Sequence, residues 1–107
     1  MTLLIKANEQ QVYMNISGDV YAEHIEFLQN NLIERLQYGY RHIVIDINDV
    51  KQFDNKGIAM LTYVRNRLLK MGGELIINDK EDLIQTEFKL HLNRLCPEGY
   101  SRTYPGT

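Results

Sequence analysis

Three aspartates lie close together near the middle of the chain: Asp46, Asp49 and Asp54. Carboxylates gathered at a strand end are the groups that divalent cations and phosphoryl-transfer sites use. Each also has an ordinary structural explanation, because Asp49 suits a turn and Asp54 suits a helix N-cap, where its carboxylate accepts backbone N–H bonds. We therefore favour structural roles for the three acids and keep a small metal-dependent enzyme only as an unfavoured alternative.

Other residues capable of chemistry are scattered. His24, His42 and His91 show no ligand spacing and fall in three different predicted elements. Cys96 has no motif that would activate its thiol. The sequence also contains no G-x-S-x-G motif, P-loop or G-x-G-x-x-G motif. It therefore predicts a binding module rather than an enzyme, with no cofactor and no metal site.

The stretch Asp54-Asn55-Lys56-Gly57 stands between a strand-like run and a helical pattern. Lys56 in the first helical turn opposes the helix dipole, which costs only about 0.3–1 kcal/mol when the lysine is exposed. Gly57 indicates a position where the backbone or a partner approaches so closely that a side chain would clash. The four residues are therefore a candidate contact surface.

The elements that position this stretch follow from hydrophobic periodicity. Short apolar runs predict strands, and apolar residues at three- and four-residue steps predict amphipathic helices. Gly39 and the pair Gly72–Gly73 suit helix ends. A turn near Asn8–Gln10 separates the first two strands. The predicted strands are 3–7, 11–18, 41–50 and 74–79, and the predicted helices are 22–39, 54–73 and 80–95.

The order of these elements defines the fold class. Alternating strands and helices imply right-handed crossovers and an α/β fold with a mostly parallel sheet of about four strands and three main helices. The β-branched run in 41–50 predicts a strand buried on both faces. Sites in such sheets lie beyond the carboxyl ends of strands, where Asp54 to Gly57 are expected. We expect one domain over 1–107, with a core at about 3–95 and an irregular tail at 96–107, in which Tyr100 and Tyr104 cover a hydrophobic edge.

Composition narrows the class of protein. The 107 residues carry a formal net charge of -2, with 44% hydrophobic and 24% charged residues. This balance gives no basic footprint for nucleic acid or an anionic membrane. No apolar run approaches the roughly 20 residues of a membrane span, and the start lacks a signal-peptide pattern. One cysteine fits a reducing compartment. We expect a cytoplasmic protein.

Four motifs together resemble the STAS domain, which is shared by anti-sigma-factor antagonists and sulfate transporters. "ISGDV" at 16–20 is similar to the family's G-[DE]-[LVI] turn, and "HIVIDINDVKQFDNKGIAML" at 42–61 to its central strand, loop and D-S-S-G helix start. "LKMGGELIIND" at 69–79 resembles its Gly-Gly helix end and following strand. "LIQTEFKLHLN" at 83–93 resembles its last helix. The resemblance covers about 3–95.

The resemblance implies a function. In the anti-sigma-factor antagonists of this family, a kinase anti-sigma factor phosphorylates the second Ser of D-S-S-G, and the unphosphorylated form binds that factor. Asp54 matches the Asp, Asn55 the first Ser, Lys56 the phosphoacceptor and Gly57 the Gly. Lysine has no hydroxyl, so we expect no phosphorylation switch at this position. Two interpretations of Lys56 stay open: a residue that contacts a partner, and a solvated lysine at a lost site. Thr62 is expected to pack or to bond its own helix, and neither Ser17 nor Ser101 matches the acceptor.

We therefore predict a non-catalytic interaction module whose partner is an anti-sigma factor or a related regulator. The alternative implied by the resemblance is an accessory subunit of a membrane transport complex. An exposed edge strand near Leu3–Ala7 offers a route to a homodimer. The predicted partner-binding residues are Gly18, Asp19, Phe53, Asp54, Asn55, Lys56, Gly57 and Ile58.

Overall fold

The structure, a computed structural model, describes residues 1–80. The elements are β1 (Thr2–Ala7), β2 (Gln11–Val20), α1 (Ala22–Tyr38), β3 (His42–Phe53), α2 (Asn55–Lys70) and β4 (Glu74–Asn78). They confirm four predicted strands and two predicted helices. The predicted helix at 80–95 and the tail at 96–107 lie outside the described residues, as do the expectations for His91, Cys96, Tyr100, Ser101 and Tyr104.

The sheet is mixed, with the strand order β1-β2-β3-β4. Strands β2, β3 and β4 are parallel, whereas β1 is antiparallel to β2 because the two form a hairpin. The turn lies at the predicted place, and Asn8 shapes it: its side-chain Oδ1 accepts hydrogen bonds of 2.8 Å from the backbone N–H groups of Gln10 and Gln11. The expected mostly parallel sheet is therefore a mixed sheet, with one antiparallel and two parallel strand pairs.

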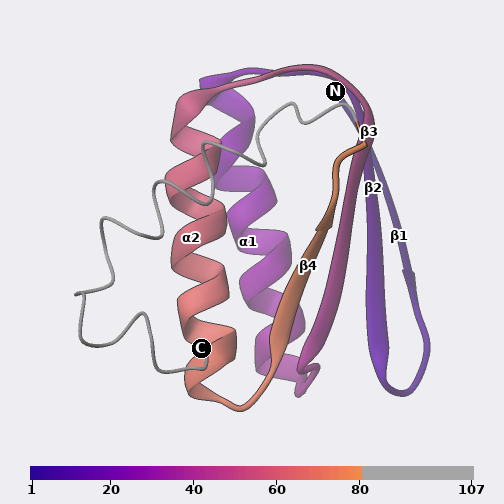
Figure 1. The fold of residues 1–107 in the computed structure, drawn as a ribbon, viewed down its shortest axis with the longest axis vertical. Helices are drawn as coiled ribbons and strands as arrows, with labels where there is room; N and C mark the ends of the chain where they lie inside the picture. Colours follow the sequence, from indigo (N-terminus) through magenta and orange to yellow (C-terminus); the bar gives the residue numbers. More distant parts are fainter. Residues whose placement is uncertain (81–107) are drawn as a thin grey trace.

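Both described helices cover the same face of the sheet (Figure 1). The strand order follows the chain order, so successive right-handed crossovers place α1 and α2 on one side. Strand β3 records this arrangement: Ile43 and Ile45 face the helices and are buried, whereas Val44 and Asp46 point to the other face and are half-buried. The expectation that this strand is buried on both faces is therefore wrong for the part of the chain that the structure describes.

The core lies between the two helices and the sheet. The apolar stripes predicted for both helices are confirmed, since all of these residues are buried. Burying each such side chain is worth about 1.5–3 kcal/mol relative to leaving it in water. Gly39 ends α1 with a φ of 108°, a left-handed conformation that favours glycine. The stripe residues are Ile25, Leu28, Leu32 and Leu36 in α1 and Ile58, Leu61, Val64 and Leu68 in α2.

Candidate functional site

Strands β2 and β3 end side by side, and a helix begins at once after each of them. Val20 is paired with Phe53 at the last position of the parallel ladder. The backbone N–H of Asp54 then donates a hydrogen bond of 3.0 Å to the carbonyl of Val20. Helix α1 starts at Ala22 and α2 at Asn55, so both helix starts lie at the same end of the molecule (Figure 1). Two chain segments distant in sequence thus meet at one surface.

Asp54 is the N-cap of α2, as the sequence predicted. Its Oδ2 accepts a hydrogen bond of 2.9 Å from the backbone N–H of Lys56, and its carbonyl accepts one of 2.8 Å from Gly57. The carboxylate therefore satisfies a donor that the first helical turn would leave without a partner and lies at the positive end of the helix dipole. Asp54 thereby fixes the backbone position from which the Lys56 side chain projects.

Gly57 is buried, and its small size serves the packing of the protein itself. A Cβ added at this position would lie 2.7 Å from Cζ of Phe53 and 3.1 Å from Cδ1 of Ile25. The close approach expected at Gly57 therefore comes from the Phe53 ring and from α1, and Gly57 does not present an open first turn to a partner. Ile58, which the sequence also placed among the partner-binding residues, is 6% exposed and belongs to the core.

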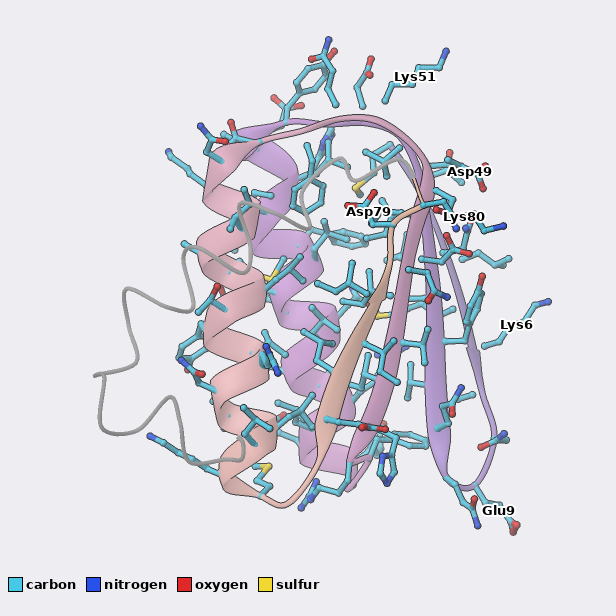
Figure 2. All side chains as sticks on the ribbon, viewed as in Figure 1. Lys6, Glu9, Asp49, Lys51, Asp79 and Lys80 are labelled. Carbon is cyan, nitrogen blue, oxygen red and sulfur yellow. The ribbon has the colours of Figure 1, made fainter. Side chains whose placement is uncertain are left out.

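The neighbouring side chains Asn55 and Lys56 are exposed. Within residues 1–80, the Lys56 ammonium group makes no ion pair or hydrogen bond. Figure 2 shows the Lys51 side chain projecting beyond this same end of the molecule. The Lys56 ammonium group therefore places a permanent positive charge at the first turn of α2, and its N–H donors are available for hydrogen bonds.

The other half of the surface comes from the end of β2. Gly18 has a φ of 85°, and the register of β2 against β3 shifts between Gly18 and Asp19. Such an irregularity re-aims the following side chains. Asp19 Oδ2 accepts a hydrogen bond of 3.2 Å from the hydroxyl of Tyr21, and the Asp19 carboxylate raises the pKa of that phenol. Asp19 thus contributes a negative charge beside the second helix start.

Tyr21 is a surface residue that the sequence reasoning missed. It is 50% exposed, and its ring centroid lies 5.7 Å from that of His24. Its backbone N–H donates a hydrogen bond of 2.9 Å to His24 Nδ1, which holds the start of α1. The available signal was its position directly after the G-D-V turn and before a helix. We define the helix-start surface as Asp19, Tyr21, Phe53, Asp54, Asn55 and Lys56.

The three aspartates that could have formed a metal site take separate partners. Asp46 Oδ2 accepts from the hydroxyl of Tyr13, Asp49 lies 3.4 Å from the amide nitrogen of Asn15, and Asp54 caps α2. Within residues 1–80, no group of three His, Cys, Asp or Glu side chains is placed to hold a metal ion. The alternative of an acid-site enzyme therefore gains no support from the described arrangement.

The other residues that could take part in chemistry lie within the helices and strands of the fold. His24 belongs to the first turn of α1, whereas His42 Nδ1 lies 3.5 Å from a carboxylate oxygen of Glu74 on β4. The predicted back-bonding of Thr62 is confirmed, because its Oγ1 donates 2.8 Å to the carbonyl of Ile58 and the residue is buried. Ser17 is half-buried within β2. Of these residues, His24 contacts the helix-start surface, through Tyr21.

The comparisons with known proteins agree with this arrangement. The family model of the STAS domain matches residues 3–103, so the chain belongs to the STAS domain family. No curated protein sequence matches the chain. Among the helices of residues 1–80, none has the length and apolar character needed to cross a membrane.

Solved structures with the same fold include two anti-sigma-factor antagonists. Unphosphorylated SpoIIAA is 12% identical with a TM-score of 0.74, and the match covers 83% of each chain. The phosphorylated form of SpoIIAA, a Bacillus cell fate determinant, also gives 0.74 at 12% identity, covering 87% of this chain and 86% of that one. The antagonist from Mycobacterium paratuberculosis is 19% identical with a TM-score of 0.65, covering 88% and 78%. At these identities the likeness shows the fold alone.

A larger protein also contains a matching part. The structure of Mglu is 20% identical with a TM-score of 0.65, and the match covers 75% of this chain but only 20% of Mglu. This chain therefore corresponds to a small part of that protein.

Proposed function

We propose that this STAS domain is a non-catalytic interaction module that binds an anti-sigma factor or a related regulator through the helix-start surface. The proposal rests on one observation above all: Lys56 is exposed in the first turn of α2, with Asp54 as the N-cap before it. The sequence resemblance matches this position to the family's phosphoacceptor. The first turns of α1 and α2 and the paired ends of β2 and β3 lie around this position. The proposal includes a cytoplasmic location, where such regulators act.

The charge at position 56 sets the expected behaviour. A phosphoserine adds about -1.5 to -2 charge and can repel a partner that binds the unmodified form. Lys56 instead carries a constant positive charge and cannot accept a phosphoryl group on oxygen. The interaction is therefore constitutive with respect to this position, and the lysine favours an acidic patch on the partner.

The test uses a purified kinase-type anti-sigma factor from the organism that carries this chain. We expect binding by calorimetry to be the same with and without ATP, and intact-mass spectrometry to find no added phosphate. Lys56→Glu should weaken binding at least tenfold, because it reverses the charge, an effect of about 1.4 kcal/mol. The control Lys70→Glu, on an exposed lysine at the other end of α2, should change affinity less than twofold.

Three outcomes would contradict this function. Equal losses for Lys56→Glu and Lys70→Glu would remove the helix-start surface from the interaction. Phosphate on Ser17 or Thr62 with loss of binding would overturn the absence of a switch. Recovery of the chain from native membranes with a transporter permease or ATPase, and no binding to the anti-sigma factor, would favour the accessory-subunit alternative.

A further inference from the structure

Within residues 1–80, strand β1 is the outer strand of the sheet and has a free edge (Figure 1). In the described part of the chain it pairs only with β2. The N–H of Asn8 donates a hydrogen bond of 3.0 Å to the carbonyl of Gln11, which makes this a hydrogen-bonded pair of the hairpin. Since such pairs alternate in an antiparallel ladder, the backbone groups of Leu3 and Ile5 point away from β2. They are donors and acceptors aimed at a further strand.

Within residues 1–80, this edge has few of the features that usually prevent edge-to-edge pairing. Native edges are blocked by proline, bulges, central charges or a covering segment. The register of Thr2–Ala7 against β2 is regular, and the strand contains no proline and a single charge, Lys6, near its end. Leu4 is 51% exposed on the face opposite the helices. The composition therefore permits another apolar strand to pair here.

We propose that β1 pairs antiparallel with β1 of a second copy of the chain, about a two-fold axis at Leu4. Leu4 then lies opposite the partner's Leu4, and Leu3 lies opposite the partner's Ile5. Leu3 and Ile5 are the residues whose backbone groups face outward, so each Leu3–Ile5 pair exchanges two hydrogen bonds. The two four-stranded sheets become one continuous sheet.

Side chains select this register from its neighbours. A shifted register can form hydrogen bonds between the two strands only if the residues whose backbone groups point outward still lie opposite each other. A shift in one direction places Leu4 opposite the partner's Lys6, and a further shift places Lys6 opposite Lys6, a like-charge pair. A shift in the other direction places Leu4 opposite the partner's polar Thr2. Only the register centred on Leu4 brings the most exposed apolar side chain of β1 against its own copy, where the Cα atoms of a non-hydrogen-bonded pair approach most closely.

A groove beside the free edge fits the same arrangement. A cavity of about 670 Å³ lies between β1 and the end of α1, and Ile5, Tyr38 and Tyr40 contribute to its wall. Leu3 and Ile5 lie on the helix-facing side of the strand, where both are half-buried. In the proposed pairing the partner's Leu3 lies directly opposite Ile5 on that side and therefore borders the groove. The groove adds contact area to the strand pair, which alone is small beside the roughly 800 Å² per partner of a standard interface.

The first test measures the molar mass of the full chain by light scattering during gel filtration, up to millimolar concentration. The wild type should approach twice the chain mass of 12.6 kDa. Leu4→Glu should return it to a single chain, whereas the matched control Ile76→Glu should remain a dimer. Ile76 is 43% exposed on the same face of β4, the other outer strand. A wild type that stays monomeric, or a dimer lost equally in both variants, would overturn the proposal.

The second test reads the register directly. In a Cys96→Ser background, Leu4→Cys places two thiols opposite each other across the axis, within the 4.4–6.8 Å between Cα atoms that a disulfide requires. Lys6→Cys places them too far apart. Under mild oxidation we expect at least tenfold more cross-linked dimer from Leu4→Cys than from Lys6→Cys, with circular dichroism confirming that both are folded. Equal yields, or a higher yield from Lys6→Cys, would refute the register.

Discussion

The hydroxyl of Tyr13 on β2 donates a hydrogen bond of 2.5 Å to Oδ2 of Asp46 on β3, on the face of the sheet opposite the helices. The Asp46 carboxylate also accepts 2.9 Å from the backbone N–H of Asn48. Together these bonds, with the Tyr13 contribution the larger, hold the pKa of Asp46 below its ordinary value of 3.8. The same bond raises the pKa of Tyr13 above 10.0. An aspartate that the sequence offered as a ligand therefore joins two parallel strands.

The pair predicts a specific pH dependence of stability. Because the folded state lowers the pKa of Asp46, its contribution is present above the unfolded value near 3.8 and is lost as the pH falls through the lower folded value. Because the folded state raises the pKa of Tyr13, that contribution is present below pH 10.0 and is lost as the pH rises further. Tyr13→Phe should therefore reduce the dependence of the unfolding free energy on pH in both the acid and the alkaline range.

Urea unfolding at several pH values measures this effect. The difference in unfolding free energy between wild type and Tyr13→Phe should shrink below pH 3.8 and above pH 10.0. Tyr38→Phe is the control, because Tyr38 is 77% exposed at the end of α1. A constant difference at every pH would show that the hydrogen bond does not control the titration.

The N-cap of α2 gives a second prediction. Asp54→Ala should lower the unfolding free energy by about 0.5–2 kcal/mol, because the backbone N–H of Lys56 loses its acceptor. Asp54→Asn should retain most of the stability, since asparagine caps helices about as well. The exposed Asp49 is the control, and Asp49→Ala should cost less than about 0.5 kcal/mol. Equal losses in the Asp54→Ala and Asp54→Asn proteins would indicate that charge, rather than capping, is responsible.

Gly57 gives a prediction whose sign departs from helix propensity. Replacing glycine by alanine in an open helix stabilises it by about 0.5–1 kcal/mol. Gly57→Ala should instead destabilise the protein by about 1–3 kcal/mol, because the new methyl group collides with the Phe53 ring.

A double-mutant cycle tests the cause of this loss. Phe53→Leu removes part of the ring, so Gly57→Ala should cost less in that background, with a coupling of at least about 0.5 kcal/mol measured by urea unfolding. Additive losses would place the strain elsewhere, for example against Ile25 of α1.

Tyr21 gives a prediction about affinity, which rests on the proposed function. Aromatic side chains that are exposed but held in place are frequent anchors of protein interfaces. Tyr21→Ala should weaken binding of the anti-sigma factor at least tenfold, or about 1.4 kcal/mol. Tyr63→Ala, which removes a 47% exposed tyrosine on the outer side of α2, should change the affinity less than twofold. The reverse order of effects would move the binding site from the helix-start surface to the part of α2 around Tyr63.

The local features of this protein could be read from the sequence because they depend on neighbours along the chain. The cap formed by Asp54 and the buried stripes of both helices follow from residue type and spacing alone. The reason for Gly57 is only partly local: Phe53 lies four residues before it in the chain, whereas Ile25 of α1 reaches it only in the folded protein. The prediction for β3 failed for a related reason. Its β-branched residues suit a strand buried on both faces, but the strand order places both described helices on one side of the sheet.

The packing beneath Gly57 also bears on how a partner would meet this protein. The side chains of Phe53 on β3 and Ile25 on α1 pack against the first turn of α2 there, and the hydrogen bond from the N–H of Asp54 to the carbonyl of Val20 joins the ends of β2 and β3. A surface built on such a foundation is preorganised. Its backbone loses little conformational entropy when a partner docks, so more of the contact energy is retained as affinity.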